Sequence, residues 1–171
     1  KEFNVPIYLE NDAKCAAIAE KELGSLKKYE DSVFLIVGTG IGGAVFLDGK
    51  LLKPKRFSGF EVGHMVINKN GIECNCGRKG CFETYCSMRR LKEKISKEFD
   101  LNTIDGIKIR EFIEKNKDNK KLNEILDEYT QNLEIGIANL INIFEPQAIS
   151  IGGSFGHYDM LLKRLQDKIN E

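Results

Sequence analysis

The sequence lacks an excess of charge of either sign. Lysine and arginine together number 26, as do aspartate and glutamate, so the formal net charge is zero. A balanced chain offers no electrostatic reason to bind nucleic acid or an anionic membrane surface. The length of 171 residues, with 42% hydrophobic and 30% charged residues, is instead typical of one folded domain with its own core.

A long uninterrupted hydrophobic run is also missing. The longest uncharged stretch, residues 32–47, is shorter than the roughly 20 apolar residues that a membrane span needs, and glycines interrupt it. Residues 1–10 contain neither the apolar core nor the cleavage site of a signal peptide. We therefore expect a cytoplasmic protein that does not associate with membranes.

The sequence also lacks an even number of cysteines. The chain has five cysteines and no secretion signal, which argues against a disulfide framework. Three of them form the pattern His-x9-Cys-x-Cys-x4-Cys with a histidine, and three thiolates with one imidazole suit tetrahedral Zn²⁺. We predict a structural zinc site whose ligands are His64, Cys74, Cys76 and Cys81. The alternative is a cluster of buried free thiols. Cys15 and Cys86 are predicted to be small buried apolar residues.

Strand-like and helix-like segments alternate along the chain. Apolar runs predict strands at residues 5–10 and 148–151 and three antiparallel strands within residues 32–53. Caps and apolar spacings of three and four predict helices at residues 12–24, 83–97, 107–117 and 122–144, with Pro146 ending the last of these. We interpret the polar stretch at about 98–121 as a peripheral insertion. A chain that opens into a strand and closes inside a helix is expected to be a fragment.

The glycine-rich turn GTGIGG, Gly38 to Gly43, follows one of the predicted strands. Glycines let backbone N–H groups approach phosphates, and Thr39 adds a hydroxyl. The turn is not a Walker A loop, which requires Gly-Lys-Ser/Thr, nor a dinucleotide fingerprint, because a strand follows it. Taken alone, it is consistent with a phosphate site or with a tight hairpin.

Several polar residues have both a structural and a chemical interpretation. Asn11 and Asp12 at a helix start are normally caps, but a carboxylate there can also accept a proton from a substrate hydroxyl. Glu61 and Glu83 are either surface carboxylates or ligands of a substrate. Gly152-Gly153 is either an ordinary turn or a close approach of the backbone to a nucleotide.

Taken in order, these motifs resemble the ROK (repressor, ORF, kinase) family of sugar kinases and sugar-responsive regulators. The matching segments are Glu10-Asn11-Asp12-Ala13, GTGIGG, Glu61-x-Gly63-His64, CNCGRKGCFE at Cys74 to Glu83, and Ile151-Gly152-Gly153. The resemblance implies an α/β fold of the actin-like (RNase H-like) ATPase type, with a mixed sheet flanked by helices and a zinc-binding loop. Residues 1–171 would be the carboxy-terminal lobe, with the amino-terminal lobe absent.

The resemblance also implies a function, glucokinase-like transfer of the ATP γ-phosphate to a hexose hydroxyl with Mg²⁺. Asp12 would be the catalytic base. The sugar would be bound by Asn11, Glu61, His64 and Glu83, and His64 would also bind zinc through its other ring nitrogen. ATP would be bound by Gly38, Thr39, Gly40, Gly152 and Gly153. Phe60 departs from the family pattern, because a small residue is common before Glu-x-Gly-His.

Two alternatives remain beside the kinase. The first is a sugar-sensing transcriptional repressor of the same family, which would bind nucleic acid through a helix-turn-helix upstream of residue 1. The second is a small zinc-stabilised interaction module. Retention of both Asp12 and the GTGIGG turn favours the kinase. In either family role, the resemblance implies a homodimer.

Overall fold

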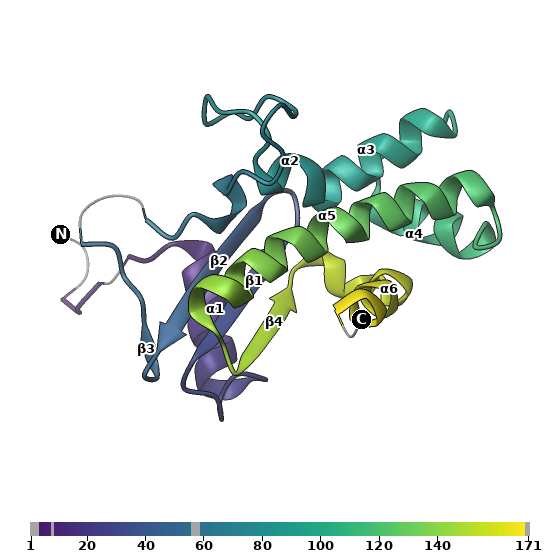
Figure 1. Ribbon diagram of the computed structural model, residues 1–171. Coiled ribbons are helices and arrows are strands. Elements are labelled where there is room, and N and C mark those ends of the chain that lie inside the picture. Colours follow the sequence, from purple (N-terminus) through teal and green to yellow (C-terminus); the bar gives the residue numbers. More distant parts are fainter. Residues whose placement is uncertain (1–3, 8, 56–58, 170–171) are drawn as a thin grey trace.

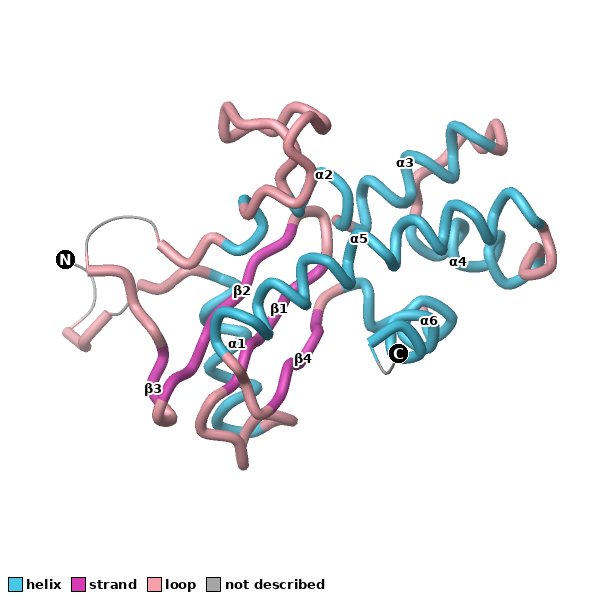
Figure 2. The backbone as a smooth tube through the Cα atoms, viewed as in Figure 1, coloured by secondary structure: helices cyan, strands magenta, loops and turns pink. Residues whose placement is uncertain are grey.

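The structure, a computed structural model, describes residues 4–7, 9–55 and 59–169. Its centre is a four-stranded mixed sheet in the order β3-β2-β1-β4 (Figure 2). The strands are β1 (Ser32–Val37), β2 (Ile41–Leu47), β3 (Lys50–Leu51) and β4 (Ala148–Gly152). β1 pairs antiparallel with β2 and parallel with β4. The predicted strands at 32–53 and 148–151 are therefore confirmed.

Two helices cover opposite faces of this sheet, α1 (Asp12–Leu23) on one and α5 (Lys120–Phe144) on the other (Figure 1). The arrangement follows from the period of two along β1. Val33 and Leu35 belong to the large core on the α5 side, whereas Phe34 packs in a smaller cluster with Ala17 of α1. Because both faces are covered, β1 is an almost continuous apolar run.

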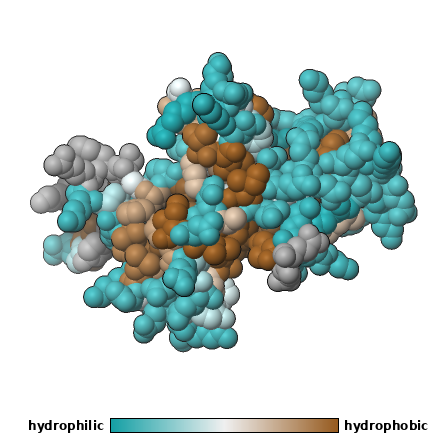
Figure 3. All heavy atoms as spheres, in the orientation of Figure 1, coloured by the Kyte–Doolittle hydropathy of each residue, from teal (hydrophilic) through white to brown (hydrophobic). Residues whose placement is uncertain are grey.

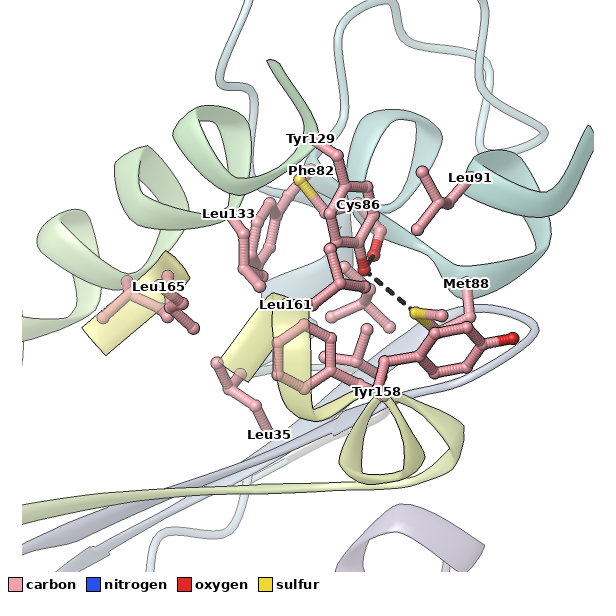
Figure 4. Close-up of a cluster of buried hydrophobic side chains, with 14 of the residues drawn as sticks. Leu35, Phe82, Cys86, Met88, Leu91, Tyr129, Leu133, Tyr158, Leu161 and Leu165 are labelled. Carbon is pink, nitrogen blue, oxygen red and sulfur yellow. Dashed lines mark hydrogen bonds between the residues drawn. The ribbon is translucent and has the colours of Figure 1, made fainter. Parts of the chain in front are cut away.

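The remaining helices lie on the α5 side of the sheet and extend the core there (Figure 1). They are α2 (Phe82–Cys86), α3 (Met88–Glu98), α4 (Gly106–Lys115) and α6 (Asp159–Ile169), together with the 3₁₀ turns η1 (Val62–His64) and η2 (Ser154–His157). Tyr129 of α5 ties α2 and α3 together, since its hydroxyl donates to the Cys86 carbonyl at 2.8 Å and lies 3.3 Å from the Met88 sulfur (Figure 4).

The predicted helix at 122–144 is confirmed as α5, which ends at Phe144 where Glu145 turns left-handed, at φ 43°, before Pro146. Part of the polar stretch 98–121 forms α4, which buries Ile109 and Ile113 in the core. Whether that stretch is an insertion relative to other proteins stays a prediction.

Three expectations were wrong. The described residues between 4 and 10 form no strand, and Val5, Ile7 and Leu9 are 64%, 76% and 98% exposed, because no described strand pairs with them. The helix predicted at 83–97 is two helices, because Ser87 is extended and caps α3 by accepting the Arg90 N–H. Cys15 is exposed, since α1 turns Ala13 and Ala17 toward the sheet instead.

The surface is mixed rather than uniformly polar. Figure 3 shows hydrophilic residues over the α3–α4 end and hydrophobic residues gathered near the middle of the same face. Ile135, Ile141 and Ile143 of α5 are exposed and contribute apolar surface. None of the helices in the described part of the chain combines the length and the apolar character that crossing a membrane requires.

Candidate functional site

The predicted metal ligands converge at one point. One ligand atom from each of His64, Cys74, Cys76 and Cys81 lies within 4.8 Å of all the others. Cys74 Sγ is 3.6 Å from His64 Nδ1, and Cys76 Sγ is 3.6 Å from Cys81 Sγ. A tetrahedral zinc with Zn–S bonds of about 2.3 Å has S···S edges of roughly 3.8 Å. The four residues therefore have the spacing and the donor chemistry to hold such an ion.

The loop that carries the cysteines folds tightly because two glycines have left-handed backbones, Gly77 at φ 85° and Gly80 at φ 78°. A Cβ at Gly80 would lie 1.6 Å from the Asn68 carbonyl oxygen, so no other residue fits there. A bridge between Val66 and Cys81 then closes the base of the loop. The sequence places glycines at the positions where the chain must wrap around the ligand cluster.

The ligand thiols have unequal environments. Burial raises the pKa of the Cys81 thiol to about 12, and contacts with the thiols of Cys76 and Cys74 add to this rise. The pKa of Cys76 is lowered, chiefly by a hydrogen bond from the Arg78 backbone N–H. A bound cation would favour the thiolate form of the whole cluster, because coordination deprotonates thiols outright.

A second group of predicted residues lines one cavity of about 290 Å³, beside the amino terminus of α1 and the glycine turn. Its lining includes Asn11, Asp12, Gly38, Thr39, Gly40, Glu61 and Glu83. These residues come from α1, the β1–β2 connection, the segment before η1, and α2. The fold thus gathers the predicted base, three of the predicted sugar ligands and the glycine turn around one space.

Asp12 is the first residue of α1 and is exposed. Its Oδ1 atom accepts the N–H of Ala13 at 2.8 Å, while Asn11 caps the helix by accepting the Lys14 N–H at 3.2 Å. The side chain of Glu10, just before them, accepts a hydrogen bond from Lys53 Nζ at 3.0 Å. The geometry is compatible both with helix capping and with proton acceptance at this helix start. Asn11 makes the capping hydrogen bond, and the Asp12 carboxylate lies beside the cavity.

The glycine turn is a hairpin loop in which the Gly38 N–H donates to the Gly40 carbonyl at 3.0 Å, between paired residues Val37 and Ile41. Thr39 is exposed at its tip. The hairpin interpretation is therefore confirmed, and phosphate binding by the same turn stays a prediction. Lys14 also lines the cavity, although we assigned it no role from the sequence. Its position two residues after Asp12, in the first turn of α1, could have indicated that its side chain lies near the same cavity.

His64 and the Gly152-Gly153 pair lie outside this cavity lining. His64 lines a neighbouring hollow of about 600 Å³, and Glu61 lines both spaces. Gly152 ends β4 opposite Ile36 of β1, and Gly153 follows with a left-handed backbone at φ 83°. A side chain at Gly153 would lie 2.7 Å from the Val37 carbonyl oxygen, so a structural need for glycine exists there without a nucleotide.

Comparison with known proteins decides the family, because the family model described as "ROK family" matches residues 1–171. The chain belongs to the ROK family. The predicted α/β fold of the actin-like type, with a mixed sheet and flanking helices, is confirmed by ROK structures. A ROK glucokinase from Streptomyces griseus, solved with glucose and AMPPNP, matches with a TM-score of 0.83 at 25% identity, covering 96% of this chain and 58% of that one.

ROK relatives of this chain include both regulators and enzymes. A xylose repressor from Caldicellulosiruptor bescii is 31% identical over 182 aligned positions, which cover 100% of this chain and 46% of the repressor. A glucokinase from Thermotoga maritima is 33% identical over 178 positions, which cover 95% of this chain and 55% of the enzyme. The chain thus spans about half the length of the curated relatives it matches.

Proposed function

We propose that the chain is the carboxy-terminal lobe of an ATP-dependent sugar kinase that phosphorylates a hexose hydroxyl. The observation that carries this proposal is the shared cavity, which is lined both by the Asp12 carboxylate and by the glycine turn from Gly38 to Gly40. A carboxylate that can accept a hydroxyl proton and a backbone turn that can approach phosphates are the parts that phosphoryl transfer requires side by side.

In this mechanism Asp12 accepts the proton of the attacking sugar hydroxyl. Glu61 and Glu83 accept hydrogen bonds from other hydroxyls of the ring, and Asn11, whose side-chain oxygen caps α1, offers its amide N–H groups. Backbone N–H groups of the glycine turn offset negative charge on the transferred phosphoryl group. ATP with Mg²⁺ supplies that phosphoryl group and neutralises part of its charge. Gly152 and Gly153 are proposed to lie near the adenosine.

The metal cluster is proposed to hold Zn²⁺ as a structural ion, because four protein donors leave no open position for water. His64 would coordinate through Nδ1, which faces Cys74, and would leave Nε2 for a sugar hydroxyl. The ion would thereby fix the loop from which Glu61, His64 and Glu83 approach the sugar.

The test is sugar-dependent ADP release by the full-length protein, with ATP, Mg²⁺ and a panel of hexoses. Asp12→Asn should lower kcat by roughly 10²- to 10⁴-fold and leave sugar affinity nearly unchanged. The amide oxygen of asparagine can still accept the Ala13 N–H, so the helix start is kept. Asp48→Asn, at the exposed β2–β3 turn, is the matched control and should retain full activity. Loss of sugar binding in Asp12→Asn would refute the base assignment.

The second candidate is a sugar-sensing repressor, which the 31% identity to a xylose repressor favours. Such a protein would keep the zinc loop and the sugar ligands and would bind nucleic acid through a helix-turn-helix upstream. Sugar binding without any turnover in the full-length protein would support this function over the kinase. In either case we propose a homodimer, for which the exposed isoleucines of α5 provide apolar surface. The mass of the full-length protein in solution would test it.

A further inference from the structure

Glu83 makes a contact that a sugar ligand does not need. Its Oε2 atom accepts the backbone N–H of Ile41 at 2.8 Å, across 42 residues of sequence. Ile41 is buried and is the first residue of β2, directly after the loop residues Gly38 to Gly40 of the glycine turn. A buried N–H requires a partner, and here the partner is a side chain on α2.

The glycine turn is shaped to admit this carboxylate. A Cβ at Gly40 would lie 2.3 Å from Glu83 Oε2 and 3.1 Å from its Cδ, whereas a Cβ at Gly38 would have no atom within 4 Å. Gly40 does not have a left-handed backbone. A side chain at position 40 would therefore displace the Glu83 carboxylate, so the contact with Ile41 depends on glycine there although the turn conformation does not.

The Gly38 end of the turn is hydrogen-bonded to α3, the helix that follows α2. The N–H of Met88, the first residue of α3, donates to the Gly38 carbonyl at 2.8 Å. The first N–H groups of a helix have no partner within it, so the turn satisfies one of them. Both ends of the turn are thus tied to α2 and α3, while Thr39 at the tip is exposed.

The position of Glu83 is determined by the segment that carries the predicted metal ligands, residues 64–81, which we call the metal loop. Cys81, one of the four ligand residues, is the N-cap of α2 and lies two residues before Glu83. Its successor Phe82 is fully buried, and the Phe82 N–H donates to the Met65 carbonyl at 2.8 Å. Phe82 also packs among the core side chains of α5 near Leu133 (Figure 4). The carboxylate that reaches Ile41 is consequently carried by a rigid support.

We infer that Glu83 is a positioning residue for the glycine turn, through which the metal loop and a bound sugar control the nucleotide phosphate site. This inference rests on the proposed function. Glu83 lines the cavity as well, and no hydrogen bond in the described part of the chain engages its Oε1 atom. A sugar hydroxyl on Oε1 holds the carboxylate in the orientation that bonds Ile41, so sugar binding orders the turn and tightens ATP binding.

The first arm of the test is hydrogen exchange in the full-length protein, followed on a peptide that covers residues 38–44. Glu83→Ala removes the acceptor of the Ile41 N–H, so exchange in this peptide should become roughly tenfold faster. Glu83→Gln keeps an oxygen that can accept the N–H and should exchange as the wild type does. A peptide from residues 129–137 of α5 reports whether the fold is intact. Unchanged exchange of residues 38–44 in Glu83→Ala would overturn the inference.

The second arm separates positioning from sugar binding by the two KM values. Glu83→Ala should raise KM for both sugar and ATP, whereas Glu83→Gln should raise KM for sugar and leave KM for ATP within about twofold. Glu61→Ala is the matched control, since Glu61 lines the same cavity and makes no hydrogen bond to the turn within the described residues. It should raise KM for sugar alone. Absence of turnover in the wild type would refute the kinase, and the exchange arm would still decide on Glu83.

Discussion

His64 Nδ1 lies 3.6 Å from the sulfur of Cys74, so the imidazole turns one ring nitrogen toward the metal cluster and keeps the other for a different partner. The same ring borders the hollow that it shares with Glu61. A metal bound by these residues would therefore set the orientation of an imidazole that borders this hollow. On the proposed function, the ion would then affect sugar affinity as well as stability.

Cys76→Ser should weaken zinc binding and raise the sugar Kd by at least about tenfold, because the loop that carries His64 loses its cross-link. Cys76 is exposed, so the substitution leaves the core intact. Zinc content by metal analysis and sugar Kd by calorimetry are the measurements, with chelation of the wild type as a second route. Cys15→Ser, another exposed cysteine, should change neither quantity. Pure wild-type protein without zinc would contradict the assignment.

Phe60→Gly should alter the choice of hexose. Phe60 has a left-handed backbone at φ 60°, a conformation that costs a bulky residue about 1–3 kcal/mol, and it directly precedes Glu61. Glycine adopts this φ without strain and lets Glu61 take other orientations. The ratio of kcat/KM between two hexoses should therefore change several-fold while KM for ATP stays constant. Phe60→Asn, which tolerates the same φ, should retain more of the original preference. An unchanged ratio in both variants would exclude Phe60 from sugar selection.

Gly136→Ala should destabilise the fold although alanine is the better helix former. A Cβ at position 136 would lie 2.3 Å from two ring carbons of Phe82, which is fully buried and has no room to move. Overpacking costs about 1–3 kcal/mol and the helix gain is about 1 kcal/mol, so we expect a net loss of up to about 2 kcal/mol. Urea unfolding measures it, and adding Phe82→Leu should recover part of the loss. Gly156→Ala, where a Cβ has no neighbour within 4 Å, is the control.

The Glu10–Lys53 pair should make the free energy of unfolding depend on pH. The hydrogen bond from Lys53 holds the pKa of Glu10 below its ordinary value of 4.5, and the Asn11 N–H adds to this. A carboxyl with a lowered pKa in the folded state contributes stability above pH 4.5, and the contribution disappears as the pH falls through the lowered value. Glu10→Gln should therefore lower Tm slightly at pH 7 and leave it unchanged in strong acid.

The effect of Glu10→Gln should also shrink in high salt, because the lysine side chain of the pair is 61% exposed. Glu22→Gln, on the exposed side of α1, is the comparison and should leave Tm unchanged at both pH values. An equal Tm difference for Glu10→Gln at neutral and acid pH would show that the ion pair is not its cause.

Patterns that are local in sequence predicted most of the fold. The apolar period along residues 122–144 predicted α5. Two of the antiparallel strands predicted within residues 32–53 form a hairpin at Asp48-Gly49, where both residues have positive φ, at 51° and 72°. The cluster predicted to bind zinc was recognisable because its residue types and spacing have few other uses, and the structure brings the four side chains together.

Features that depend on distant contacts were not predictable from the sequence. Ser87 interrupts a segment whose apolar spacing continues through it, so a single helix was the natural expectation. Cys15 was assigned to the core from its residue type, but the side of α1 that it occupies depends on where the sheet lies. The bond between Glu83 and Ile41 joins a side chain to a backbone N–H 42 residues away, and no periodicity encodes such a contact.

The division of the cavity between two parts of the fold has an evolutionary consequence. Asp12 comes from the start of α1, whereas Glu61 and Glu83 flank the segment that carries the predicted metal ligands. On the proposed function, exchange of one residue at position 12 lowers kcat by orders of magnitude and leaves the sugar-binding residues and their scaffold intact. A protein with this architecture would then pass from enzyme to sensor through few substitutions and without a change of fold, which agrees with the similarity of this chain to both a repressor and a glucokinase.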